Sequence, residues 1–414
     1  MTRKSDDTRT RDRAGRASAA GDEEGALAAS SAHPSDEMLP FLNNFHDIFT
    51  TIGILILSGG LGLGVVQLLS GTGFAAGSLA WQIIAILLLA GTALIYWGIS
   101  AVLVGRQRRI LPGVVLSLAF TGSAALVLGW LYYLGVTELW QVDPEAFDAA
   151  FETGAPDASI REQVDAVLAE LPLPVRIFPV VAVLAALLPV LVYYRSFRLP
   201  FAGGLTGVGL VALAAATYLV ADPYAFVVHL PLINLLAGLA LFLAGLVFDM
   251  RDPARTTRLS GTGFWLHFFA APTLLGAAVN ATYTGWRLDE SDFADPAAAG
   301  GPIGAMASGE SGEAVALAGV TLAVIAGFAL VSLLINRRAL IVSGLITAGI
   351  SIGVLVSQLG LGAGTVVAVT LLALGGVVVI LGAAWNPVRR VLLAPFPRQG
   401  PLARLFPPAR GLAG

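Results

Sequence analysis

The chain has 414 residues, of which 56% are hydrophobic and only 12% are charged, and its mean hydropathy is +0.81. A soluble domain carries about 25% charged residues, so this composition excludes a soluble globular enzyme and also a disordered or collagen-like chain. The apolar residues stand in long blocks, which indicates a polytopic membrane protein. Cysteine is absent, so disulfides, zinc–thiolate sites and thiol catalysis are excluded.

Residues 1–40 are polar and charged, without apolar periodicity, and are predicted to form a disordered cytoplasmic tail. The transmembrane domain is expected to cover residues 41–384. A hydrocarbon core of about 30 Å takes about 20 helical residues to cross, and helices are expected because unpaired backbone groups cannot face lipid. Ten segments reach that length: 48–69, 79–104, 110–134, 175–194, 201–220, 226–248, 261–283, 314–335, 339–359 and 362–384. The predicted fold class is therefore all-α, a bundle of about ten transmembrane helices.

The arginines predict how this bundle is oriented. All but three of the 24 basic residues fall in the two tails and in the connections after the second, fourth, sixth and eighth segments. The exceptions are Arg161, Arg176 and Arg287, on the side that holds most of the 27 acidic residues. Arginine-rich short loops stay in the cytoplasm, so both termini are predicted to be cytoplasmic. The excess of arginine over lysine suits a GC-rich bacterial genome, and the expected location is the bacterial inner membrane.

Two longer loops are expected on the outer side. The loop 136–174 is predicted to be structured, because Ser159 and Glu162 stand at the spacing of a capping box. The helix that follows places an apolar stripe on one face: Ile160, Val164, Val167, Leu168 and Leu171. This stripe is expected to lie on the outer membrane surface or to cover the helix bundle. The loop 284–312, rich in Gly, Ala, Ser and acid, is expected to be irregular and mobile.

Residues 385–414 are predicted to form a basic, interfacial and proline-rich cytoplasmic tail. Trp385, Arg389 and Arg390 stand beside apolar residues there, a pattern typical of a segment that lies on anionic lipid. The expected partners are the bilayer and its anionic headgroups at the cytoplasmic face. The sequence indicates no nucleic-acid partner and identifies no protein partner or oligomeric state.

The most distinctive stretch joins an Arg- and Thr-rich connection to an aromatic helix. Arg255 and Arg258 are candidates to hold a phosphate or an anionic headgroup, because arginine forks match phosphate oxygens. The alternative is that they only set the topology. His267, further along, is expected either to line a polar cavity or to bond to a neighbouring helix.

This stretch resembles a set of uncharacterised bacterial polytopic membrane proteins with a D-P-x-R-x-x-R…F-W-L-H-x-x-A-A-P signature. The matching positions are Asp252, Pro253, Arg255, Arg258, Phe264, Trp265, Leu266, His267, Ala270, Ala271 and Pro272. The resemblance extends more loosely to residues 109–112 and 385–390. It implies a shared multi-helix fold and no particular activity.

Few polar side chains fall within the predicted segments. His229, Asn234, His267 and Asn280 are candidates either to line a cavity or to pack, because polar groups at such depth commonly bond to a neighbouring helix. All carboxylates fall outside the segments, with Asp249 just beyond the sixth, so proton coupling through a buried carboxylate is not expected. The four histidines are never three or four residues apart, so neither a metal site nor another cofactor is expected.

Three glycine pairs at a spacing of four residues are expected to pack helix against helix within the bundle, and the alternative is that they form a dimer interface. They start at Gly60, Gly203 and Gly349.

Two functions stay open. A transporter or permease for a small neutral or amphipathic solute fits ten helices with glycine breaks. The alternative is a structural, assembly or envelope-associated membrane protein without transport or catalysis, which fits the plain core and the acidic outer loop. A membrane enzyme is disfavoured, because no loop gathers carboxylates, histidine and a nucleophile into one set.

Overall fold

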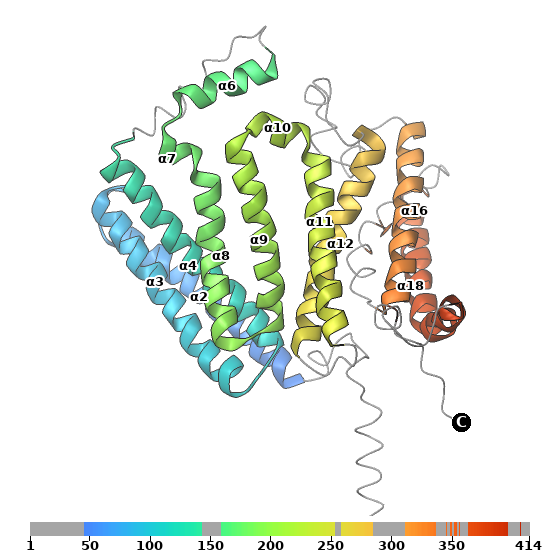
Figure 1. Ribbon diagram of the computed structural model, residues 1–414. Helices are drawn as coiled ribbons and strands as arrows, with labels where there is room; N and C mark the ends of the chain where they lie inside the picture. Colours follow the sequence, from blue (N-terminus) through green and yellow to red (C-terminus); the bar gives the residue numbers. More distant parts are fainter. Residues whose placement is uncertain are drawn as a thin grey trace, which may run out of the picture.

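The computed structural model describes residues 45–142, 159–252, 258–284, 311–336 and 363–395, with a few positions between 345 and 356 and at 406. Within these residues every regular element is a helix (Figure 1). Eight helices are long and apolar enough to cross a membrane, which supports a multi-pass membrane protein. The expectations for the tail 1–40, for the loop 284–312 beyond residue 284, for most of the segment 339–359 and for most of the chain after residue 395 lie outside the described residues.

The helix bounds follow the predicted segments closely. The long helices are α2 (Phe45–Gly71), α3 (Leu79–Ser100), α4 (Leu111–Leu134), α8 (Phe178–Phe197), α9 (Pro200–Ala221), α11 (Leu230–Arg251), α12 (Arg258–Thr284), α16 (Ser311–Ile335) and α18 (Ala363–Leu393). Two π-helical turns, η1 (Ala101–Arg106) and η2 (Gly135–Leu139), extend α3 and α4. The remaining short helices are α6 (Ile160–Glu170), α7 (Leu173–Arg176) and α10 (Pro223–Val228).

The sixth predicted segment, 226–248, is wrong in two respects. The chain breaks at His229 into α10 and α11, because Pro231 has no N–H to bond back across the break and instead sits in the first turn of a new helix. At its other end α11 continues to Arg251. Asp249 therefore belongs to the last turn of a helix, and not to the connection where the sequence placed it.

The C-terminal part of α18 also differs from the expectation. The helix passes through Pro387 and ends at Leu393, where a separate interfacial segment was expected, and its last turns, in red, point away from the rest of the helix (Figure 1). Trp385 and Arg389 are buried: Trp385 Nε1 donates to Asn336 Oδ1 (3.1 Å) and Arg389 Nε donates to the Leu333 carbonyl (2.9 Å). Both side chains thus bond to the end of α16 and its following turn.

Helix α12 fills the seventh predicted segment, although it is not among the eight most apolar helices. It contacts α9, α11 and α16, and of its described side chains only Pro272 is exposed. Neighbouring helices cover most of α12, whereas the outer helices have exposed apolar faces. Helix α12 can therefore carry polar residues such as Thr262 and His267, which are both buried.

Glycines allow this close packing around α12. A Cβ placed at Gly203 would lie 2.8 Å from the Thr262 side chain, and one at Gly207 would meet Leu266, which confirms the expectation for that pair. Gly349 likewise faces Leu374 of α18, at 3.2 Å. For the pair that starts at Gly60 the described residues show no such packing, since a Cβ at Gly60 or Gly64 would meet no described atom within 4 Å, and a dimer interface stays open as the alternative.

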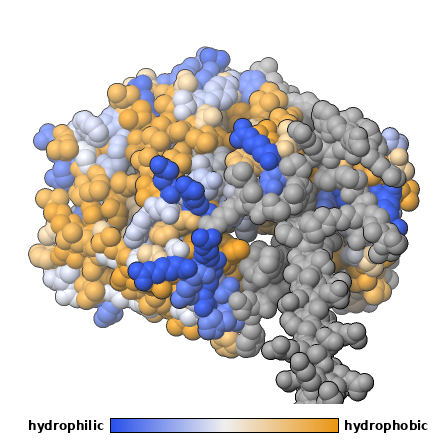
Figure 2. Space-filling view, turned by 60° about the horizontal axis from the view of Figure 1, so that its bottom comes forward, coloured by the Kyte–Doolittle hydropathy of each residue, from blue (hydrophilic) through white to orange (hydrophobic). Residues whose placement is uncertain are grey.

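The helix connections alternate between the two ends of the bundle (Figure 1). The end that holds the start of α2, the α3–α4 and α8–α9 connections and the end of α11 is called the arginine-rich end. Its exposed arginines are Arg106, Arg108, Arg195, Arg198 and Arg251. Figure 2, which brings this end forward, shows hydrophilic side chains gathered beside apolar flanks. The opposite end, called the α6 end, holds η2, α6, α7 and α10.

Candidate functional site

A pocket of about 860 Å³ lies beneath α6 at the α6 end of the bundle. Helix α6 lies across the ends of α8 and α9 like a roof (Figure 1). The walls come from η2 and the end of α4, from α7 and the start of α8, and from the α9–α10 corner. Its lining residues include Tyr132, Val167, Leu168, Arg176 and Phe178.

Helix α6 presents its apolar stripe to this pocket. Ser159 Oγ accepts from the Glu162 N–H (3.4 Å) and the Glu162 carboxylate accepts from the Ser159 N–H (3.0 Å), so the predicted capping box is confirmed. Val164 and Val167 are half-buried and line the pocket, whereas Glu162 and Asp165 are exposed. Of the two placements expected for the stripe, the structure therefore favours the one in which it covers the bundle.

Two arginines hold α6 in place at its two ends. Arg161, in the first turn, lies over the Tyr224 ring of α10 at 5.4 Å, a cation–π contact. Arg176, on α7, donates from Nε to the Leu171 carbonyl (2.7 Å) and from Nη2 to the Ala169 carbonyl (3.2 Å). A cation at these carbonyls also matches the negative end of the α6 dipole. These are two of the three basic residues that the sequence places opposite the arginine-rich side.

The wall that carries Arg176 is rigid. Pro172, Pro174 and Pro179 restrict the backbone on either side of it. Tyr132 at the end of α4 donates its hydroxyl to the Pro174 carbonyl (2.5 Å), and its ring packs near that of Phe178, with 6.3 Å between the centroids. These contacts constrain the backbone that carries Arg176, and its two bonds to the Leu171 and Ala169 carbonyls orient the guanidinium.

The chemistry of the lining suits an apolar or amphipathic molecule. Most of its residues are aliphatic, aromatic or proline, and the polar ones are Tyr132, Tyr133, Thr137, Gln163 and Arg176. Among the described lining residues Arg176 is the one charged side chain, and none of them is a carboxylate. A volume of about 860 Å³ also falls in the range of about 300–1,000 Å³ typical of small-molecule sites.

A second polar site lies between α11 and α12, near the arginine-rich end. His267 Nε2 donates to Asp249 Oδ2 at 3.1 Å, and the His267 side chain is fully buried. The two helices accommodate this pair reciprocally: a Cβ at Gly245 of α11 would lie 2.8 Å from the His267 ring, and one at Gly263 of α12 would lie 2.7 Å from Asp249 Oδ1. Of the two roles expected for His267, bonding to a neighbouring helix is the one that the structure confirms.

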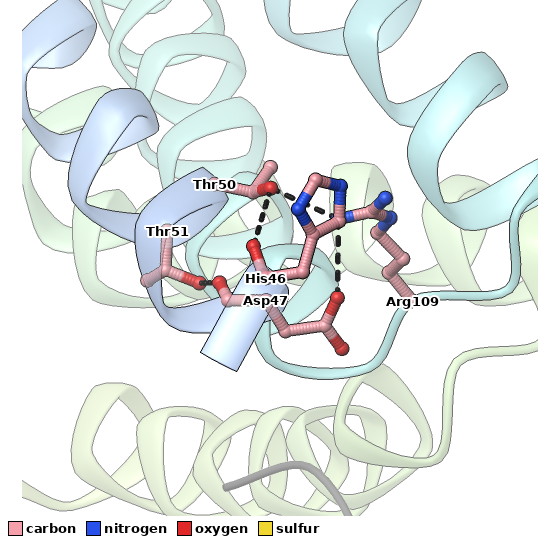
Figure 3. A network of polar contacts seen from close by, with 5 residues as sticks. All are labelled: His46, Asp47, Thr50, Thr51 and Arg109. Carbon is pink, nitrogen blue, oxygen red and sulfur yellow. Dashed lines mark hydrogen bonds and ion pairs between the residues drawn. The ribbon is translucent and has the colours of Figure 1, made fainter. Parts of the chain in front are cut away.

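A third polar network joins the start of α2 to the α3–α4 connection (Figure 3). Arg109 Nη1 donates to Asp47 Oδ1 (3.2 Å) and to Thr50 Oγ1 (2.9 Å). The Thr50 and Thr51 hydroxyls in turn donate to the carbonyls of His46 and Asp47. Because Asp47 is buried at the helix start, this network fixes α2 against its neighbours and has the character of a structural contact.

The other candidate residues do not gather at one place. His229 caps the junction between α10 and α11, where its Nδ1 bonds to the Ala225 carbonyl (2.8 Å), and Asn234 is half-buried one turn into α11. His229 and Asp249 are 20 residues apart along the helix, about 30 Å at 1.5 Å per residue. The side chains of Asn280, Arg255 and Arg258 lie outside the described residues.

The two arginines of the α18 end have different surroundings. Arg389 is buried against Leu333, which does not agree with the headgroup contact expected for it. Arg390 is exposed, and its contact with anionic lipid stays a prediction.

The sequence did not single out the pocket residues other than the α6 stripe. Tyr132, Arg176 and Phe178 come from separate segments of the chain, and only the outlying position of Arg176 among the basic residues hinted at a special role. Among the described residues no group of three or more His, Asp or Glu side chains could hold a metal ion. No protein-family model, curated protein or solved structure matches the chain.

Proposed function

We propose that this multi-pass membrane protein is a transporter or permease for an amphipathic solute, which enters through the pocket beneath α6. The observation that carries the proposal is the pocket itself, with an apolar lining, one cation and a volume suited to a small molecule. A bundle that served only as a scaffold would be expected to pack such a space at the density of a protein interior.

The position of the pocket supports this function. Its walls are the ends of α4, α8 and α9, which are long and apolar enough to span a membrane, so a molecule dissolved in the bilayer reaches it directly. Its roof is a short amphipathic helix joined to α7 by Leu171 and Pro172. The buried His267–Asp249 pair lies towards the other end of the bundle, where α11 and α12 are in contact. A solute path through the bundle would therefore have the amphipathic helix α6 at one end and the buried His267–Asp249 pair towards the other.

The test is solute movement in proteoliposomes, with fluorescent single-chain amphiphiles that differ only in headgroup. Val167→Trp puts a large ring into the pocket and should abolish both binding and transfer. Ala166→Trp is the matched control, because Ala166 is the adjacent residue on the exposed face of α6. Wild-type protein and the Ala166 variant should behave alike.

Two results would contradict the proposal. Equal effects of the Val167 and Ala166 substitutions would show that the pocket is not the site. Binding without any transfer in the wild-type protein would refute transport and favour the alternative, a structural or assembly protein that holds an amphiphile. Copurification of a stoichiometric protein partner would support that alternative further.

A further inference from the structure

We infer that the pocket beneath α6 selects an anionic membrane lipid, whose acyl chain lies among the apolar lining residues and whose headgroup binds Arg176. The inference rests on the proposed function and names the chemical class of its solute. It commits to a lipid from the leaflet at the α6 end, since the pocket lies where the helix ends meet the headgroup region.

Arg176 has donors to spare for such a headgroup. A guanidinium carries five N–H donors in a planar fork, and the described contacts of Arg176 are the two with the Leu171 and Ala169 carbonyls. Three N–H groups are left for a ligand. Those two contacts and the flanking prolines orient the fork, so little entropy is lost when a phosphate or carboxylate binds to it.

The charge pattern favours an anion over a cation or a neutral group. Of the lining residues that the structure describes, Arg176 is the one ionisable residue apart from two tyrosines. The acids of α6, Glu162, Asp165 and Glu170, are exposed and are not among the described lining residues. An anionic headgroup at Arg176 therefore gains a charge-assisted hydrogen bond. No carboxylate of a described lining residue repels it.

The aromatic residues near the pocket are those of a membrane interface. Tyr132, Tyr133 and Phe178 line it, and Trp140 lies near Tyr132, with 6.1 Å between the ring centroids. Tyr and Trp are enriched at the headgroup level of bilayers. At this depth the pocket accepts an acyl chain from the hydrocarbon side while Arg176 stays at headgroup level.

The experiment is a binding measurement on the full chain in nanodiscs of neutral phosphatidylcholine. Two fluorescent probes share one C16 acyl chain and differ in headgroup: a monoacylglycerol phosphate and a monoacylglycerol. Wild-type protein should bind the phosphate probe at least about tenfold more tightly, since hydrogen bonds between charged groups are stronger than those of a neutral headgroup. Arg176→Gln should remove that preference, so that the two probes bind with equal affinity.

Two further variants separate binding from folding. Arg176→Lys keeps the charge without the fork and should retain part of the preference. Arg195→Gln removes the same charge from the arginine-rich end, away from the pocket lining, so the preference should persist. If Arg176→Gln does not fold, the wild-type preference and the Arg176→Lys variant decide the question.

The outcomes distinguish this inference from the proposed function. Equal wild-type affinity for both probes, with both displaced by Val167→Trp, would overturn the charge selection alone. Binding of neither probe would overturn the pocket as a solute site as well. A large gain in affinity for both probes on deletion of residues 145–156 would show that this segment of the chain occupies the pocket, and would overturn the inference.

Discussion

Replacing Gly245 with alanine is expected to destabilise the α11–α12 interface. The new Cβ would lie 2.8, 2.9 and 3.0 Å from the Cε1, Nε2 and Nδ1 atoms of the His267 ring. The ring has little room to move, because Nε2 is hydrogen-bonded to Asp249 and the Phe242 ring packs against it with 5.1 Å between the centroids. Either the hydrogen bond must lengthen or the two helices must separate.

The magnitude follows from three opposing effects. Glycine to alanine inside a helix is favourable by about 1 kcal/mol in the absence of contacts. Overpacking a close-packed interface costs about 1–3 kcal/mol, and losing a hydrogen bond to a charged group costs about 1.5–3 kcal/mol more. The net destabilisation of Gly245→Ala is therefore expected to be about 1.5–5 kcal/mol.

The assay is equilibrium unfolding in mixed micelles, monitored by tryptophan fluorescence. Gly276→Ala is the matched control, because Gly276 lies on α12 and a Cβ there meets no described atom within 4 Å. That variant should be neutral or more stable by up to about 1 kcal/mol. Indistinguishable free energies of unfolding for the two variants would refute the proposed packing of His267 and Asp249 against these glycines.

Three further predictions concern α6, α2 and the topology. Tyr224→Ala removes the ring beneath Arg161 and should raise the labelling rate of a cysteine introduced at Val167, while one at Ala166 stays equally reactive; unchanged rates would mean that this contact does not hold α6. In a double-mutant cycle, Asp47→Asn and Arg109→Gln should show a coupling free energy of about 1 kcal/mol in unfolding measurements; additive effects would contradict the network of Figure 3. Reporter fusions at Arg108 and Arg198 should report the cytoplasm and one at Glu170 the opposite side, and the reverse pattern would invert the predicted orientation.

Hydropathy was enough to predict most of the helices. Helix α9, for example, begins and ends within one residue of the predicted segment 201–220. The sixth segment was predicted wrongly because the sequence stays apolar on both sides of His229, so hydropathy shows no break there. The break arises because Pro231 has no N–H to continue the helix hydrogen bonds. The capping box of α6 was predictable because its two residues are local in sequence.

The candidate site depends on contacts that are distant in sequence. Tyr132 and Pro174 are 42 residues apart, and Arg109 and Asp47 are 62 apart, so a pattern within one segment does not reveal either pair. The His267–Asp249 bond was missed for a different reason. Asp249 was assigned to a connection, yet the last turn of α11 brings it level with His267, and two glycines on the facing helices make room for both side chains.

Photocrosslinking at position 167 tests most directly the central claim, that the pocket beneath α6 binds an amphiphile. p-Benzoylphenylalanine is incorporated at Val167, or at Ala166 as the control, and the full chain is irradiated in its native membrane and analysed by mass spectrometry. We predict a lipid adduct with an anionic headgroup at position 167 and little adduct at position 166. Crosslinks from position 167 only to residues 143–158 or to a second copy of the chain, or equal lipid labelling at both positions, would contradict the claim.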